Sequence, residues 1–255
     1  MGSGWAFLDH PGPLAFAHRG AHAADGPGEN TMAAFDAAVA LGFGYIETDV
    51  HLTADGIVVA FHDDHLDRVT DMTGAISELP WSEVRHAKVG ANGDPVPRLD
   101  EILERFGGVK VNIDPKHNRV VEPLALVLER AGAVDRVCCG SFSDARLARL
   151  RTLLGPRLCT SLGPRATAKL AAAAAGAPVR RLAGPCAQVP THIGRRRLVT
   201  PRFVRAAHAL DVQVHVWTID GAEEMGELLD MGVDGLMTDR SDILKAVLES
   251  RGEWP

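Results

Sequence analysis

The sequence is poor in cysteine, with only Cys138, Cys139, Cys159 and Cys186 among its 255 residues. This number and the irregular spacing argue against a disulfide framework, and no CxxC or Cys/His pattern typical of a zinc site is present. The simplest interpretation is that all four are small residues buried on strands.

A long apolar segment is also missing. No run of 18 or more apolar residues occurs, so the sequence predicts no transmembrane helix. Residues 1–5 lack the positively charged region and the long apolar region of a secretion signal. We therefore expect a cytoplasmic protein.

An excess of positive charge is absent as well, because the formal net charge is −6. A general nucleic-acid binder needs a positive footprint, so nucleic acid is not expected as a partner. Basic clusters at residues 180–181 and 195–197 are first interpreted as solvated faces. The alternative is that they border a pocket and attract anionic substrates or lipid headgroups.

What the sequence does contain is an alternation of short apolar runs with segments of helical periodicity, which is typical of βα units around a parallel sheet. A length of 255 residues suits a single domain of this kind, so we expect one α/β domain over residues 1–255, folded as a (β/α)8 TIM barrel. The expected strands are 14–17, 45–50, 109–114, 136–140, 157–160, either 181–183 or 187–189, 213–218 and 235–238. The expected helices include 31–41, 119–131, 144–154, 201–210, 222–231 and 242–249, and the alanines at 171–175 indicate another outer helix.

Charged motifs follow directly on several of these apolar runs. In a parallel barrel, the carboxyl ends of the strands build the active site, so motifs far apart in sequence meet over one mouth. Two histidines can act as acid and base near neutral pH, and carboxylates two residues apart on one strand face can share a hard cation. The motifs are His18-Arg19-Gly20, Glu47 with Asp49, His62-Asp63, and Asp114 with Lys116.

Read together, these motifs resemble the glycerophosphodiester phosphodiesterase family. The likeness extends from about residue 14 to about residue 245. Its further blocks are Pro27-Gly28-Glu29-Asn30-Thr31, Leu66-Asp67-Arg68-Val69-Thr70, Val96-Pro97-Arg98-Leu99-Asp100-Glu101, Val216-Trp217-Thr218 and residues 232–239.

The resemblance implies metal-dependent hydrolysis of glycerophosphodiesters to sn-glycerol 3-phosphate and an alcohol. It implies that Glu47, Asp49 and Asp114 bind one divalent cation. Oxygen ligands without cysteine favour Mg²⁺ or Ca²⁺, with Mn²⁺ also compatible. Asp114 departs from the family pattern, which has glutamate at this position, and its shorter side chain could weaken the bound ion or admit a bridging water.

Roles for the other motif residues follow from the same chemistry. His18 and His62 are the expected acid and base, with their individual roles left open. Arg19 and Lys116 are expected to bind the phosphoryl oxygens, and Trp217 is expected to line the substrate pocket or to belong to the core.

Three residues are expected to support the site from behind or beside it. Glu29 and Asn30 either support the metal and substrate ligands from outside or begin a helix, since Asn is a favoured N-cap. His51 shares the strand face of Glu47 and Asp49 and is interpreted as pocket lining.

Between residues 63 and 97 the sequence is rich in Asp, Thr, Gly and Pro, and residues 79–81 are its only strong apolar anchor. The resemblance places a small insertion here, after the second strand, and we expect it to cap one side of the pocket.

Two alternatives to the glycerophosphodiesterase hypothesis remain open. One is a lipid phosphodiesterase of the lysophospholipase D or sphingomyelinase D kind. The other is a barrel that binds glycerophosphate groups without cleaving them, since a fold alone does not establish an activity. Headgroup preference and oligomeric state are not indicated by any motif.

Overall fold

The computed structural model describes residues 4–23 and 25–254. Residues 1–3, part of the segment considered above for a secretion signal, lie outside the described residues.

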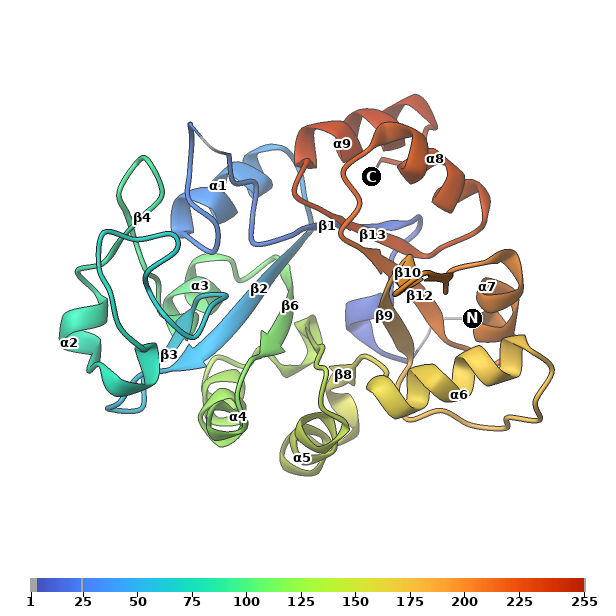
Figure 1. Ribbon diagram of the computed structural model, residues 1–255, viewed down its shortest axis with the longest axis horizontal. Coiled ribbons are helices and arrows are strands. Elements are labelled where there is room, and N and C mark those ends of the chain that lie inside the picture. Colours follow the sequence, from blue (N-terminus) through green and yellow to red (C-terminus); the bar gives the residue numbers. More distant parts are fainter. Residues whose placement is uncertain (1–3, 24, 255) are drawn as a thin grey trace.

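Eight parallel strands form the centre of the molecule, with helices around them (Figure 1). Each strand is short and almost entirely buried, as expected for a sheet covered on both faces. The strands are β1 (Leu14–Ala17), β2 (Tyr45–Leu52), β6 (Lys110–Pro115), β7 (Val137–Cys139), β8 (Cys159–Thr160), β9 (Cys186–Pro190), β12 (Gln213–Trp217) and β13 (Gly235–Thr238).

The order of the strands is that of a nearly closed barrel. The first and last strands pair in parallel, with Ala17 opposite Thr238, and the other neighbours follow chain order. Between β8 and β9 the continuous pairing is replaced by a single parallel bridge between Ser161 and Cys186. This weak seam is the one place where the described ring of strands is not a regular ladder.

Helices cover the outside of the barrel and enclose a large apolar core between themselves and the strands. Glycines with positive φ, such as Gly132 and Gly232, follow several of them, which is a common way to end a helix. The covering helices are α1 (Met32–Ala40), α3 (Leu99–Arg105), α4 (Val121–Arg130), α5 (Asp144–Leu154), α6 (Pro164–Ala174), α7 (Pro201–His208), α8 (Ala222–Asp230) and α9 (Ser241–Ser250). Short 3₁₀ turns are η1 (Ala6–Leu8), η3 (Asn118–Val120), η4 (Val134–Arg136) and η5 (Gly155–Arg157).

The insertion after β2 has its own small core. It begins with β3 (Val58–Ala60), which pairs antiparallel with β2, and it projects from the left of the barrel in Figure 1. Leu79 and Trp81 are only partly buried, whereas Leu66, Ile76 and Val84 are fully buried, so the expectation of a single anchor at 79–81 was wrong. The other elements of the insertion are η2 (Ile76–Glu78), α2 (Trp81–Val84), β4 (Lys88–Val89) and β5 (Asp94–Pro95).

The expected barrel is therefore confirmed, with differences at the level of single elements. Of the two candidates for the sixth strand, residues 187–189 lie in β9, and residues 181–183 form no strand. Helix α3 and strand β3 were not expected. A second small hairpin, β10 (His192–Ile193) with β11 (Arg196–Arg197), follows β9 and carries part of the basic cluster 195–197. No helix within the described residues has the length and apolar character needed to cross a membrane.

Candidate active site

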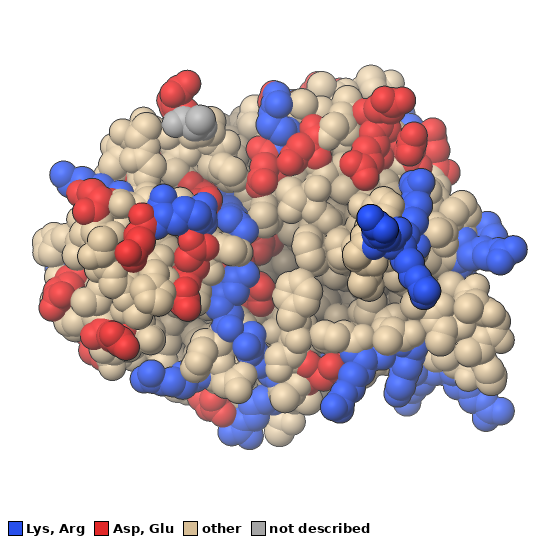
Figure 2. Space-filling model, viewed as in Figure 1, with Lys and Arg blue, Asp and Glu red and all other residues tan. Residues whose placement is uncertain are grey.

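A cavity of about 600 Å³ lies at the carboxyl ends of the strands. Figure 2 shows it as a hollow, with charged side chains on its left and mostly uncharged surface on its right. All of the residues expected to act in catalysis, phosphate binding or metal binding line this one cavity, namely His18, Arg19, Glu47, Asp49, His62, Asp114, Lys116 and Trp217. The sequence therefore predicted correctly which side chains meet.

The first loop, after β1, owes its shape to two residues with left-handed backbone. Gly20 has φ of 83°, and a Cβ on it would lie 2.7 Å from the carbonyl carbon of Ala34, so no other residue fits there. Arg19 has φ of 55°. This bend lets the backbone N–H of Arg19 donate to Glu47 Oε2 at 3.1 Å, which ties the loop to β2.

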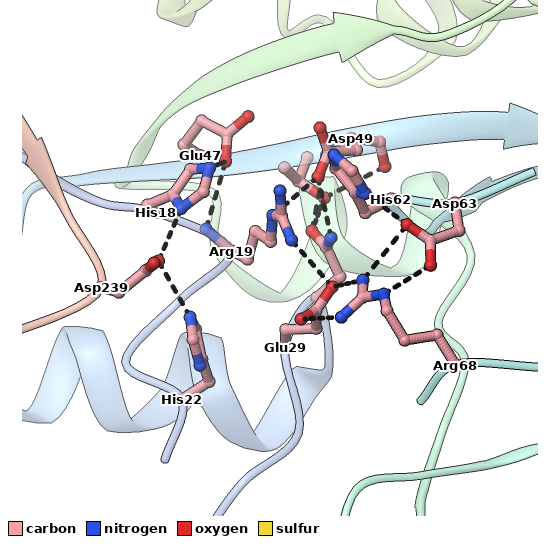
Figure 3. A network of polar contacts seen from close by, with 12 residues as sticks. His18, Arg19, His22, Glu29, Glu47, Asp49, His62, Asp63, Arg68 and Asp239 are labelled. Atoms are coloured by element: carbon pink, nitrogen blue, oxygen red, sulfur yellow. Dashed lines mark hydrogen bonds and ion pairs between the residues drawn. The ribbon is translucent and has the colours of Figure 1, made fainter. Parts of the chain in front are cut away.

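His18 is held by aspartate. Its Nδ1 lies 2.6 Å from Asp239 Oδ1, and His22 Nε2 approaches the same oxygen at 3.1 Å (Figure 3). Burial opposes ionisation of Asp239, but the hydrogen bonds from His18 and His22 outweigh it and lower the pKa of this carboxyl. An ionised carboxylate only accepts, so His18 Nδ1 carries the proton, and in the neutral ring Nε2 has the free lone pair.

Two carboxylates also set the charge preference of His18. Its Nε2 lies 3.8 Å from Glu47 Oε2. Burial by itself lowers the pKa of His18, yet the charges of Glu47 and Asp239 raise it overall. The protonated form of this imidazole is therefore favoured by its surroundings.

His62 has the same arrangement with a different aspartate. Its Nδ1 donates to Asp63 Oδ1 at 2.5 Å, and Asp63 is in turn held by Arg68, whose Nε lies 2.5 Å from Oδ2. The hydrogen bond from Arg68 keeps the pKa of Asp63 at about 2, so Asp63 is ionised at neutral pH. His62 thus also carries its proton on Nδ1 and keeps the Nε2 lone pair when it is neutral.

Glu29 joins the two halves of this network. Its carboxylate accepts from Arg19 Nη1 at 3.0 Å and from Arg68 Nη2 at 2.7 Å, and Figure 3 shows it between the two guanidinium groups. Arg19 Nε lies 3.3 Å from Asp49 Oδ2. Glu29 does not line the cavity, and its contacts orient the arginine that does.

Asn30 supports Asp49 and does not cap the following helix. Its side-chain amide donates to Asp49 Oδ2 at 3.0 Å, and its oxygen accepts from Thr48 Oγ1 at 2.7 Å. The N-cap of α1 is Thr31, whose hydroxyl accepts from the N–H of Ala34. The alternative of Asn30 as N-cap was wrong, because buried contacts to β2 hold its side chain.

His51 lies behind His62 and outside the cavity lining. Its Nε2 lies 3.0 Å from the backbone oxygen of His62 and fixes the chain there. Burial lowers the pKa of His51, so its neutral form is favoured. The interpretation of His51 as pocket lining was wrong, although it supports a residue that lines the pocket.

Acidic and basic groups alternate on the floor of the site. Asp49 and Asp114 are register partners on β2 and β6, and Lys116 Nζ contacts Asp49 Oδ1 at 2.6 Å and Asp114 Oδ2 at 2.9 Å. Burial opposes the charge of Asp49, but Lys116 and Arg19 outweigh it and lower the pKa of this carboxyl.

Around Glu47 and Asp114, the nearby positive charges do not offset the effect of burial on the carboxyl pKa. Burial, and then the charge of Asp49, raise the pKa of Glu47 to about 7, and burial raises the pKa of Asp114. Asp114 Oδ1 is buried and finds no hydrogen-bond partner among the described residues. Carboxylate oxygens that lack compensating positive charge are chemically suited to bind a divalent cation.

The carboxylate oxygens of Glu47, Asp49 and Asp114 are more widely separated than the ligands of a preformed metal site. In the described part of the chain, their oxygens do not all lie within 4.8 Å of one another, and Lys116 contacts two of them. A cation at this place would therefore require a shift of the Lys116 ammonium.

Trp217 stands at the mouth, where its ring meets that of Phe142 edge-on with a centroid separation of 5.8 Å. Sequence reasoning assigned no role to Asp239, His22 or Arg68, although Asp239 and Arg68 belong to recognised motifs. The signal for Asp239 was its position directly after the last strand, which pairs with the strand that ends before His18.

The contact of Asp239 with His18 leads to a first prediction. Asp239→Asn keeps the shape of the side chain but removes the charge that orients the imidazole, so kcat should fall roughly 10- to 100-fold, as when supporting groups behind an active residue are replaced. The limb of the pH profile governed by His18 should move to lower pH. The control is Asp242→Asn, an exposed residue that pairs with Arg240. Equal kcat in the two variants would show that Asp239 does not support His18.

The fold and the site together define a barrel enzyme whose pocket combines paired histidines with carboxylates and cations. The chain belongs to the glycerophosphoryl diester phosphodiesterase family, whose model matches residues 18–243. This membership confirms the resemblance seen in the motifs and the enzyme class it implied, a glycerophosphodiester phosphodiesterase.

Individual relatives agree with the family assignment. A probable glycerophosphodiester phosphodiesterase 2 of Mycobacterium tuberculosis (strain ATCC 25618 / H37Rv) is 43% identical over 253 residues, which cover 97% of this chain and 95% of that protein. A glycerophosphodiester phosphodiesterase structure from Agrobacterium tumefaciens str. C58 is 27% identical, with a TM-score of 0.76 over 93% of this chain and 99% of that one. The fold is also shared with an Oleispira antarctica phosphodiesterase solved with its product sn-glycerol-3-phosphate, at 22% identity and a TM-score of 0.75 over 93% and 97% of the two chains.

Proposed function

We propose that this protein hydrolyses glycerophosphodiesters to sn-glycerol 3-phosphate and an alcohol, with the help of one divalent cation, Mg²⁺, Ca²⁺ or Mn²⁺. The observation that carries the proposal is the pair of aspartate-backed histidines that line one cavity together with Arg19 and Lys116. The product is the one named for the Oleispira antarctica structure.

Positive groups in the cavity are suited to bind the phosphoryl oxygens, where negative charge increases during cleavage. Arg19 offers a planar guanidinium for two oxygens, and Glu29 fixes its direction through the 3.0 Å contact. Lys116 supplies a second positive group, and although burial lowers the pKa of its ammonium, the charges of Asp49 and Asp114 outweigh burial and raise it.

The histidines perform the proton transfers. Both hold a proton on Nδ1 against an aspartate, so each has Nε2 available for exchange. One accepts the proton of the nucleophile and the other donates to the departing alkoxide. The nucleophile is either the glycerol hydroxyl of the substrate or water, and detection of a cyclic glycerol phosphate would identify the first route.

Glu47, Asp49 and Asp114 are the residues that would hold the cation. When bound, it withdraws charge from a phosphoryl oxygen as a Lewis acid. Asn30 holds Asp49 in place for this task through its 3.0 Å hydrogen bond.

A lipid phosphodiester is the second candidate substrate, because one wall of the cavity is apolar. Leu162, Val189, Leu198 and Trp217 line this wall, and it leads to Phe142 and Ile193, which are 71% and 60% exposed at the mouth. Exposed apolar residues beside a pocket suit a substrate with an acyl chain. In Figure 2 a basic cluster stands beside the hollow, where Figure 1 places β10.

One assay separates these possibilities. Purified protein is incubated with glycerophosphocholine, glycerophosphoethanolamine and a lysophospholipid, each with and without divalent metal. We expect metal-dependent release of sn-glycerol 3-phosphate from the first two. Cleavage of the lysophospholipid alone would replace our proposal by the lipid one, and cleavage of none would leave a binding barrel.

The apolar wall yields a second prediction. Phe142→Ala together with Ile193→Ser should lower kcat/KM for a lysophospholipid roughly 5- to 10-fold, since burying about half of a large apolar side chain contributes on the order of 1 kcal/mol. The value for glycerophosphocholine should stay within about twofold. Leu126→Ser, at an exposed position on α4, is the control. A parallel loss on both substrates would show that these residues do not contact an acyl chain.

A further inference from the structure

Three of the four cysteines meet inside the barrel. Cys138 on β7, Cys159 on β8 and Cys186 on β9 are buried, and their sulfur atoms all lie within 4.8 Å of one another. Cys138 Sγ and Cys186 Sγ are 3.8 Å apart. The fourth cysteine, Cys139, lies on the opposite face of β7, in the core beneath the helices.

This cluster forms the layer directly below the active-site cavity. Side chains alternate along a strand, so the residues two positions further share its inward face. For Cys138, Cys159 and Cys186 these are Gly140, Ser161 and Gln188, and all three line the cavity. Barrel layers are usually filled by bulky branched residues, whereas here three adjacent strands supply thiols.

His215 on the next strand, β12, lies opposite Gln188, and its ring nitrogens are not within 4.8 Å of all three sulfur atoms. It is fully buried, and its Nε2 lies 3.1 Å from Oε1 of Gln213, an acceptor, so Nε2 carries the hydrogen. Its Nδ1 therefore has a lone pair, and this atom finds no hydrogen-bond partner among the described residues.

We propose that Cys138, Cys159 and Cys186 form a structural zinc site in the barrel interior. Three thiolates and one imidazole are a standard ligand set for tetrahedral Zn²⁺, and the unpartnered Nδ1 of His215 would have to turn toward the cysteines to complete it. Two sulfur ligands at about 2.3 Å from a tetrahedral ion are about 3.8 Å apart, which is the separation of Cys138 and Cys186. Carboxylates and water, the preferred ligands of Mg²⁺ and Ca²⁺, are not part of this set.

The position of the site indicates what the ion would do. Cys159 and Cys186 stand on the two strands that flank the weak seam, where one bridge replaces the ladder. An ion bound by both would link β8 to β9 and hold the barrel closed directly beneath the catalytic cavity. Because the ligands are buried, the ion must enter during folding and leave only slowly.

The test measures bound zinc. Protein produced in zinc-supplemented medium, with any metal-binding tag removed, is dialysed against EDTA and analysed for metal by mass spectrometry. We expect one zinc ion per chain to remain after the dialysis. Zinc that is lost together with the catalytic cation would belong to the carboxylates and would overturn the proposal.

Variants locate the ion. Cys159→Ala should retain less than about one tenth of the wild-type zinc, whereas the control Cys139→Ala, the next residue of β7 after Cys138, should retain all of it. Equal zinc in both variants would overturn the proposal.

A measurement on the unmodified chain covers the case in which a variant fails to fold. Wild-type protein is unfolded in EDTA and refolded with Co²⁺, which should give a sulfur-to-cobalt charge-transfer band in the near ultraviolet. Refolding with Mg²⁺ is the blank. Refolded wild type that lacks the cobalt band and also binds no zinc would show that the cysteines only fill space.

Discussion

Replacing either His18 or His62 by alanine should lower kcat by roughly 10²- to 10⁴-fold, the usual contribution of a general acid or base. The structure supports equal importance for the two, because each imidazole is fixed by an ionised aspartate and lines the same cavity. The measurement is kcat on glycerophosphocholine at saturating metal, with circular dichroism to confirm that the variants fold.

The chain offers a matched control for this experiment. His65 also contacts the aspartate that precedes it, at 3.0 Å, but it is exposed and does not line the cavity. His65→Ala should leave kcat within about twofold of wild type, as expected for an exposed position. If His18→Ala or His62→Ala behaved like His65→Ala, that histidine would have no part in proton transfer.

Glu47→Gln should reduce kcat/KM at low metal concentration on the order of 10²- to 10³-fold, because a cation contributes several kcal/mol of transition-state stabilisation and its binding depends on charged ligands. The substitution keeps the volume of the side chain and an oxygen that can accept from the Arg19 N–H. Since the loss arises through affinity for the ion, excess cation should restore part of the activity.

A metal titration distinguishes a loss of affinity for the cation from disruption of the loop after β1, which Glu47 holds through the Arg19 N–H. The apparent activation constant for the cation should rise in Glu47→Gln and stay unchanged in Glu104→Gln, an exposed position on α3. An unchanged constant in Glu47→Gln, or full wild-type activity in the presence of a strong chelator, would remove Glu47 from the metal site.

Much of the site could be predicted because its parts are local in sequence. The motif at 18–20 follows one apolar run, and Glu47 and Asp49 share one strand face. Because the carboxyl ends of barrel strands build the active site, these residues are expected to meet in one pocket. The same rule placed Asp114 and Lys116 beside them, and the register of Asp49 with Asp114 confirms their proximity.

The contacts that could not be predicted depend on strands that are distant in sequence. Asp239 reaches His18 only because β13 closes against β1, and the three cysteines meet only because β7, β8 and β9 are neighbours in the barrel. Cysteine spacing along the chain carries no sign of this cluster.

Locally ambiguous residues were decided by tertiary contacts. Asn30 and Thr31 are both good N-caps by type, and the buried hydrogen bond from Asn30 to Asp49 leaves Thr31 to cap the helix. The arginine-bearing segment 181–183 and the run 187–189 both looked like strands. Only the second can pair with β12 along its length, as the register of Val214 with Ala187 shows.

The central claim is that carboxylates from β2 and β6 hold a cation where His18 and His62 can both reach the same phosphorus. The most direct measurement is a crystal structure of the protein with Mn²⁺ and sn-glycerol 3-phosphate, with the ion located by its anomalous signal. The account predicts the ion on oxygens of Glu47, Asp49 and Asp114, and a phosphate within hydrogen-bond reach of both imidazoles. An ion bound elsewhere, or a phosphate that neither histidine can reach, would contradict it.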